Sequence, residues 1–321
     1  MRVALRIAEP AAAAATLAVV VWRLGTGPFL DGVRAVDARA LLAAGAIGVV
    51  TTLCCAWRWT VVARGLGLRL PLRVAVAACY RSVFLNLTLP GGVAGDVHRG
   101  VAHGRDVRDV GRALRGVACE RAAGQVVQGL LTIAVLLALP SPVRSSMPFV
   151  LAVLVAAAAG LVLLGWVRAG AGSRLARARD AVVADVRAGL LGRKTLPAVA
   201  LASAVVVVGH TVTFVVAART TGVDASTARL LPLALLALLA MVLPSVAGWG
   251  PREGATAWVF SSAGLGADRG AATAVAYGVL VVAAALPGAV VLLAGWLPRR
   301  RRSSPSRPPP VRVRAKEALD A

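Results

Sequence analysis

The sequence predicts an all-α integral membrane protein, folded as a multi-pass helical bundle. Of its 321 residues 58% are apolar and only 16% are charged, and the mean hydropathy is +0.78. A soluble globular chain of this length is much less apolar. A helix that spans a bilayer needs ~20 mostly apolar residues. Six such spans are predicted, at residues 7–24, 40–62, 116–139, 148–167, 197–218 and 271–297.

The first span resembles a secretory signal because Arg2 and Arg6 precede it. Trp22 and Arg23 follow it in place of a small-residue cleavage site, so we interpret it as a retained helix. The net charge of +22 does not indicate a nucleic-acid partner, because the basic residues are concentrated in one set of loops and the loops on the other side of the membrane carry few. By the positive-inside rule the basic loops are cytoplasmic, which places both termini in the cytoplasm. We expect the membrane to be the plasma membrane.

Two further apolar stretches are too short or too interrupted to be simple spans. Residues 74–89 lie between two basic segments that both belong in the cytoplasm, and the sequence breaks at Pro90, Gly91 and Gly92. Residues 230–266 lie between two loops with few basic residues and break within LPSVAGWGPREG, residues 243–254. The pattern predicts two re-entrant hairpins that enter from opposite sides. The alternative is that both breaks are ordinary loops between short, complete helices.

The predicted elements divide the chain into two halves, about 1–140 and 141–297, followed by a basic, Pro-rich tail at 298–321 that we expect to be disordered and cytoplasmic. Each half would contain three crossings and one broken hairpin. An odd number of crossings gives the halves opposite orientation, which predicts an inverted repeat. In transporters of this architecture the substrate site lies between the halves, near the middle of the bilayer.

The first break carries groups that suit an anion. A half-helix that starts after Gly95 directs its unpaired N–H groups and positive dipole end into the interior. Asp96 lies at the start of this half-helix, and Arg99 follows on the same face. Asn86 lies just before the break. We therefore predict that the substrate-binding residues of this break are Asn86, Pro90, Gly91, Gly92, Gly95, Asp96 and Arg99.

The second break has a similar composition. Gly248, Gly250 and Pro251 precede Arg252 and Glu253, and proline suits the first turn of a helix. A lipid phosphate is an anion that guanidinium groups bind bidentately, so the arginine of each break is a candidate phosphate ligand. The alternative is that each arginine pairs with its neighbouring carboxylate, or extends to the surface, and only holds the fold.

The span at 116–139 adds a polar face. Its polar residues follow at helical spacing: Arg121, Gln125, Gln128 and Thr132, with Glu120 beside them. We take Glu120, Arg121 and Gln125 as candidate substrate-lining residues, and hydrogen bonding between helices is the alternative. His210 is a candidate proton-coupling group. The alternative is a neutral, hydrogen-bonded histidine that packs beside Thr211 or Thr213.

The remaining features predict structural roles. The four cysteines lie in apolar runs without metal-ligand spacing, and no cofactor is expected. Trp57 and Trp59 fit an aromatic belt at the membrane surface, with Arg58 extending to that surface between them. Residues 173–194 show helical spacing of apolar residues among arginines, which predicts a helix on the inner leaflet.

Three segments together carry a resemblance to a known family: FLNLTLPGGVAGDVHRG at 84–100, CERAAGQ at 119–125 and LPSVAGWGPREGA at 243–255. In this order they resemble the lysylphosphatidylglycerol synthase transmembrane region, also described as the flippase-like domain family. The resemblance implies a multi-pass protein that moves aminoacylated, polyprenyl-linked or other lipids between leaflets. It extends over about residues 40–297 and does not include a synthase domain, so it implies no synthase activity here.

Three functions follow as hypotheses. The first is a lipid flippase or transporter for membrane lipids with anionic headgroups. The second is a membrane-embedded enzyme on lipid-linked phosphate or sugar, for which Asp96, His98 and His103 form only a weak metal-ligand pattern, so we expect no enzymatic activity. The third is a membrane partner that recruits a separate synthase or glycosyltransferase.

Overall fold

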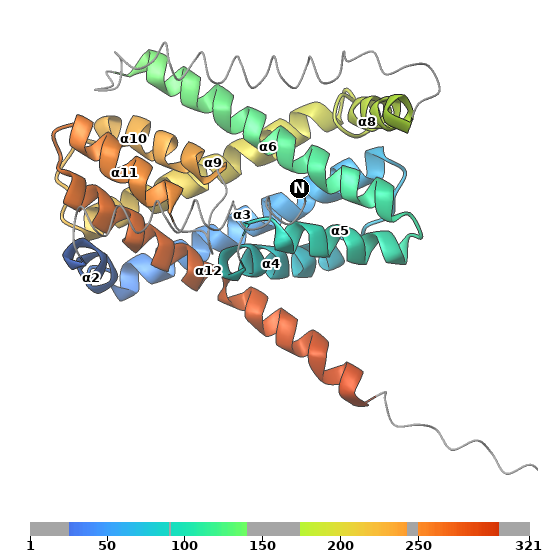
Figure 1. Cartoon of the computed structure of the whole chain (residues 1–321), viewed down its shortest axis with the longest axis horizontal. Coiled ribbons are helices and arrows are strands. Elements are labelled where there is room, and N and C mark those ends of the chain that lie inside the picture. The colour runs from blue at the N-terminus through green and yellow to red at the C-terminus, as the bar shows by residue number, and fades with distance from the viewer. Residues whose placement is uncertain (1–25, 90, 140–173, 243–249, 302–321) are drawn as a thin grey trace, which may run out of the picture.

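The computed structural model of the chain describes residues 26–89, 91–139, 174–242 and 250–301, and of residues 174–179 and 295–301 only the helical backbone. Over these ranges the chain is all-helical (Figure 1). This confirms the predicted helical class for the part of the chain that is described.

Four helices are long and apolar enough to cross a membrane. They are α3 (Ala38–Gly65), α6 (Val110–Ala138), α9 (Thr195–Thr220) and α12 (Ala267–Arg301, apolar over Ala267–Ala294). They coincide with the spans predicted at 40–62, 116–139, 197–218 and 271–297. The spans predicted at 7–24 and 148–167 lie outside the described residues. Helix α12 runs into the predicted tail as far as Arg301, and residues 302–321 are likewise not described.

Each predicted break separates two short helices. Helix α4 (Leu72–Thr88) and helix α5 (Ala94–Asp106) are joined through Gly91 and Gly92, whose φ angles are 92° and 63°. Only glycine adopts such angles readily. Helix α10 (Thr227–Leu239) continues into one 3₁₀ turn (Ala240–Val242), and α11 (Pro251–Ser262) begins after Gly250.

Helices α3 and α9 run in opposite directions. The end of α3 meets the end of α8 (Arg174–Gly189), just before α9 begins: a Cβ on Gly65 would lie 2.7 Å from the carbonyl oxygen of Ala188. The end of α9 meets the start of α12, where the hydroxyl oxygens of Thr221 and Thr273 lie 2.9 Å apart. Figure 1 shows that the α4/α5 hairpin enters from the end near α8, and the α10/α11 hairpin from the end near α2 (Gly27–Arg34). The end of α4, the start of α5 and the start of α11 therefore lie toward the middle of the bundle.

The packing partners of α3–α6 are matched by those of α9–α12. Helix α3 packs against α9, α4 packs against α12 as α10 packs against α6, and α5 packs against α6 as α11 packs against α12. Helix α2 contacts α12 as α8 contacts α6. Exchanging the two halves therefore preserves the main helix contacts.

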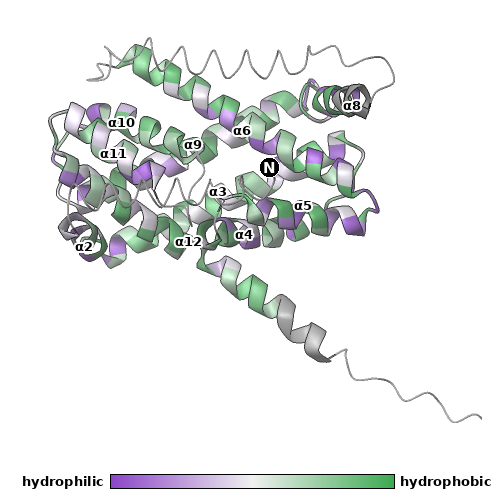
Figure 2. Ribbon diagram, viewed as in Figure 1, coloured by the Kyte–Doolittle hydropathy of each residue, from purple (hydrophilic) through white to green (hydrophobic). Residues whose placement is uncertain are grey.

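The outer faces of the long helices are apolar. Leucine and valine side chains on α3, α6, α9 and α12 are exposed, among them Leu42, Leu130, Leu201 and Val290, and Figure 2 shows these helices coloured mainly as hydrophobic. Large exposed apolar areas indicate contact with a partner or a membrane rather than with water. The buried core includes aromatic residues on α9, α11 and α12: Phe214, Phe260 and Tyr277.

Candidate functional site

The start of α5 is fixed tightly against α4. Gly95 lies so close to α4 that a Cβ there would be 2.0 Å from the carbonyl oxygen of Ser82. The side chain of Asn86 accepts a hydrogen bond from the Gly95 amide at 2.7 Å and donates one to Asp96 at 2.8 Å. The Ser82 hydroxyl donates to the other carboxylate oxygen of Asp96 at 3.1 Å. The predicted positions of Asn86, Gly95 and Asp96 therefore form one hydrogen-bonded unit.

From Asp96 a chain of ion pairs runs through the protein interior. Arg99 donates to Asp96 from Nε at 2.9 Å and to Glu120 from Nη2 at 2.6 Å. Glu120, which is 1% exposed, also accepts from Arg58 Nε at 2.6 Å. Arg58 Nη1 then donates to the hydroxyl of Ser203 on α9 at 2.8 Å. The chain links α5, α6, α3 and α9, so it joins the two halves of the bundle.

Arg121 completes the charged group. It forms an ion pair with Asp96, and its side chain is 39% exposed, whereas those of Arg58 and Arg99 are 8% and 6% exposed. We call the five side chains the charged cluster: Arg58, Asp96, Arg99, Glu120 and Arg121. Three guanidinium groups face two carboxylates, which leaves one surplus positive charge.

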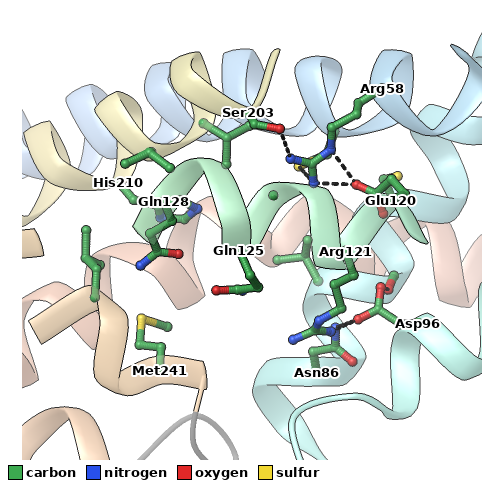
Figure 3. Close-up of a pocket in the computed structure, with 18 of the residues that line it drawn as sticks. Arg58, Asn86, Asp96, Glu120, Arg121, Gln125, Gln128, Ser203, His210 and Met241 are labelled. Atoms are coloured by element: carbon green, nitrogen blue, oxygen red, sulfur yellow. Dashed lines mark hydrogen bonds and ion pairs between the residues drawn. The ribbon is translucent and has the colours of Figure 1, made fainter. Parts of the chain in front are cut away.

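A cavity of about 270 Å³ opens beside the charged cluster. Gln125 and Gln128 of α6 and Asn86 of α4 add polar groups to its wall, and Figure 3 shows Arg121 and Gln125 on the same side of α6. Among the described residues, the buried Oε1 of Gln125 has no hydrogen-bond partner. The remaining wall is mostly apolar and comes from several helices: Val83, Val206, Val207, Leu238 and Met241. The cavity wall therefore combines a charged, polar part with apolar side chains.

His210 and Tyr277 line the same cavity. The Nδ1 atom of His210 lies 2.9 Å from the Tyr277 hydroxyl, which makes Tyr277 its hydrogen-bond partner. The hydroxyls of Thr211 and Thr213 instead donate to backbone carbonyls one turn earlier. His210 is thus a hydrogen-bonded histidine, with a partner on α12 rather than on its own helix.

The start of α11 is held in a different way from the start of α5. Glu253 is fully buried, accepts from the Gly250 amide at 2.7 Å and pairs with Arg252. The Arg252 guanidinium lies 5.2 Å from the centre of the Tyr277 ring. Gly250, Arg252 and Glu253 do not line the cavity, whereas Arg99 does. Tyr277 thus lines the cavity and contacts Arg252, which is not itself among the lining residues. Each of the two arginines pairs with its neighbouring carboxylate.

The other predicted site residues are placed as follows. Gly91 and Gly92 form the turn before α5 and do not line the cavity, and Pro90 and Gly248 lie outside the described residues. Thr132, on the polar face of α6, is buried, and its hydroxyl donates to the Gln128 carbonyl. Among the residues that the structure describes, no three His, Cys, Asp or Glu side chains are grouped to hold a metal ion.

The predicted surface positions of Arg58 and Trp59 are wrong. Arg58 does not extend to the surface: it is buried against Glu120, in a space that Gly124 leaves open, since a Cβ on Gly124 would lie 2.8 Å from Arg58 Nη1. Trp59 is 1% exposed, and the Arg99 guanidinium lies over its ring, 4.7 Å from the ring centre. Trp59 therefore does not belong to a surface belt. The signal that could have found this arrangement is the occurrence of Arg58, Glu120 and Ser203 inside apolar spans.

Four apolar helices of spanning length, packed around a buried ion-pair chain, define a multi-pass helical membrane protein. The model of the protein family described as lysylphosphatidylglycerol synthase TM region matches residues 4–289, and the chain belongs to this family. The match includes most of the chain and agrees with the resemblance carried by the three sequence segments. No curated protein matches the sequence.

Proposed function

We propose that this protein binds a lipid with an anionic headgroup in the cavity beside the charged cluster and moves it between the two leaflets. The observation that carries this proposal is the surplus positive charge of the charged cluster, whose partly exposed Arg121 lines the cavity. Phosphate accepts two parallel hydrogen bonds from a guanidinium group. The apolar wall of Leu238 and Met241 suits the part of a lipid next to its headgroup.

We further propose that the two halves form an inverted repeat with re-entrant hairpins. The opposite directions of α3 and α9 and the matched helix contacts support this arrangement. So does the length of α4, since 17 residues extend only about 26 Å, less than the ~30 Å thickness of the hydrocarbon core. The Arg58–Ser203 hydrogen bond is then a contact between halves that the movement of one half against the other would break.

The proposed orientation places the end of the bundle near α8 in the cytoplasm. Basic residues gather there, at the end of α3, the end of α5 and the start of α6: Arg64, Arg69, Arg105, Arg112 and Arg115. The positive-inside rule assigns such loops to the cytoplasmic face of the plasma membrane. In this orientation α4 and α5 enter from the cytoplasmic side, and α10 and α11 enter from the outside.

Leaflet exchange in liposomes tests the function. The purified full chain is reconstituted with acyl-labelled phosphatidylglycerol, and a membrane-impermeant quencher reports the fraction of label that reaches the outer leaflet. We expect exchange above that of protein-free liposomes. The Arg121→Gln variant should exchange the lipid about 10- to 100-fold more slowly, since a hydrogen bond to a charged group contributes about 1.5–3 kcal/mol.

The matched control is Arg187→Gln, which also removes one positive charge but lies on the exposed side of α8. It should retain the wild-type rate. If the wild-type chain moves no anionic lipid, the transport proposal fails and a role as a membrane partner of a synthase or glycosyltransferase is favoured. Metal-dependent turnover of a lipid-linked substrate would instead favour an enzyme.

A further inference from the structure

We propose that the cavity binds a lipid phosphate together with one proton, which His210 takes up, so that lipid binding depends on pH. This inference rests on the proposed function and adds a proton site to the same cavity. The proton balances the charge of the phosphate, which aminoacylated and other phospholipids share, so the inference sets no condition on the rest of the headgroup. It follows from the position of His210 between two cavities and from its partner Tyr277.

A second, smaller cavity of about 70 Å³ lies mainly between α3, α9 and α12. His210 and Cys55 belong to its wall and also to the wall of the larger cavity, so His210 lies where the two cavities meet. The side chains of Thr51, Thr52 and Thr213 add hydroxyl groups to the smaller wall. This volume has room for more than one water molecule, and polar partners are what hold water in a cavity. Water can therefore bring a proton to the imidazole ring.

Tyr277 is a hydrogen-bond partner that suits both protonation states of His210. In a neutral imidazole one nitrogen donates and the other accepts, whereas in the charged ring both donate. The Tyr277 hydroxyl lies 2.9 Å from Nδ1 and can either donate to this nitrogen or accept from it. When it accepts, its own hydrogen can point into the larger cavity, which Tyr277 also lines. His210 can therefore take up a proton without losing this buried hydrogen bond.

The carboxylates around His210 are already paired. The charged cluster and the thiols of Cys55 and Cys79 line the same cavity, and each carboxylate of the cluster is shared by two arginines. On α11, Glu253 pairs with Arg252, which contacts the Tyr277 ring. Helix α10 and the 3₁₀ turn after it add only apolar residues to the wall. Among the described residues of these walls, no carboxylate remains to pair with a charged His210.

An anion in the cavity changes this balance. In the empty cavity an imidazolium would be a buried charge without a counter-charge, beside the surplus positive charge of the cluster, so the ring is neutral. A phosphate supplies the missing negative charge and makes proton uptake favourable. Linkage is reciprocal, so the proton strengthens phosphate binding by the same factor. Binding should therefore tighten as the pH falls, and this gain should disappear as the pH rises through the range in which the loaded site releases its proton.

The first arm of the test measures the proton by calorimetry. A short-chain phosphatidylglycerol is titrated into the full chain in neutral detergent, in buffers that differ in their enthalpy of ionisation, which gives the number of protons taken up per lipid. We expect a maximum of nearly one proton between about pH 5 and 8, and an affinity that falls by up to about tenfold per pH unit. Binding without proton uptake anywhere in this range would overturn the inference and leave the proposed function intact. No binding would overturn both.

The second arm removes the titrating group. His210→Gln keeps a hydrogen-bonding side chain beside Tyr277, and it should bind the lipid without proton uptake and with an affinity that does not change with pH. The control, His98→Gln, removes an exposed imidazole that lines neither cavity and should keep the wild-type uptake. A second variant, Tyr277→Phe, keeps the imidazole and removes its partner, so its maximum uptake should move to lower pH. Wild-type uptake in His210→Gln, or its loss in His98→Gln, would overturn the assignment to His210.

The third arm distinguishes a lipid from a soluble phosphodiester. The same calorimetry is carried out with glycerophosphoglycerol, which has the headgroup without acyl chains. It should bind at least about tenfold more weakly, since each buried CH₂ contributes about 0.8 kcal/mol and the apolar wall of Leu238 and Met241 would have no acyl chain to contact. Proton-linked binding of equal affinity would overturn the assignment of a lipid as the ligand that is coupled to the proton.

Discussion

Replacing Glu120 with glutamine should destabilise the protein more than any other single change of a charge in the cavity wall. The substitution keeps the size of the side chain and removes its negative charge. Two guanidinium groups, 8% and 6% exposed, would then lie beside a neutral amide. Since one oxygen of an amide cannot accept both arginines as the carboxylate does, some of their N–H groups would lose their partner.

The expected cost follows from the contacts that remain. Removing one partner of a buried ion pair costs about 3–5 kcal/mol. Arg99 keeps its bond to Asp96 at 2.9 Å, and Arg58 keeps its bond to Ser203 at 2.8 Å. We therefore expect a loss of about 3 kcal/mol in the free energy of unfolding, at the lower end of that range.

The measurement is a titration of the purified protein in mixed detergent and SDS micelles, which gives the free energy of unfolding for the wild type and the variant. A second variant, Glu120→Gln combined with Arg58→Met, removes one of the two stranded charges and should recover part of the loss. Neighbours that share a network are typically coupled by about 0.5–3 kcal/mol. A loss below about 0.5 kcal/mol in Glu120→Gln would refute the view that the cluster is a buried, coupled network.

Two further predictions concern the helices around the site. Gly95→Ala should destabilise the protein by about 1–3 kcal/mol, because its Cβ would lie 2.0 Å from the carbonyl oxygen of Ser82. Gly129→Ala, where a Cβ meets nothing within 4 Å, is the control, and an equal effect of both in the same SDS titration would contradict the packing argument. Asp185→Asn should loosen α8 by about 1 kcal/mol, since it weakens the 2.5 Å contact with the partly exposed Arg115. Hydrogen exchange of α8 amides should then accelerate, and unchanged exchange would show that the pair does not hold the helix.

The helices were predictable because their signals are local. Apolar runs of spanning length marked α3, α6, α9 and α12, and glycines and prolines marked the two breaks. The position of Asp96 in the first turn of α5 and its ion pair with Arg99 followed from helical spacing alone. Pro251 in the first turn of α11 was expected because proline suits that position of a helix.

The partners between helices could not be read from one sequence, because they depend on how the helices rotate and cross. Arg58 was assigned to the surface since a long side chain near two tryptophans can extend there, yet α6 places Glu120 opposite it. The space beside Gly124 and the hydroxyl of Ser203 complete its surroundings, and both come from other helices. Arg252, like Arg99, was a candidate phosphate ligand, but it pairs with Glu253, lies against the Tyr277 ring and is not among the residues that line the cavity.

The measurement that tests the central claim most directly is photo-crosslinking with a lipid. A phosphatidylglycerol analogue with a diazirine next to its phosphate is added to the reconstituted full chain, and the crosslinked residues are mapped by mass spectrometry. We predict crosslinks at the cavity wall, on Gln125, Gln128 or Met241, which excess unlabelled anionic lipid removes and which Arg121→Gln weakens. Crosslinks confined to outward residues such as Leu130 and Leu201, unaffected by competitor or variant, would contradict the claim that the cavity holds the headgroup.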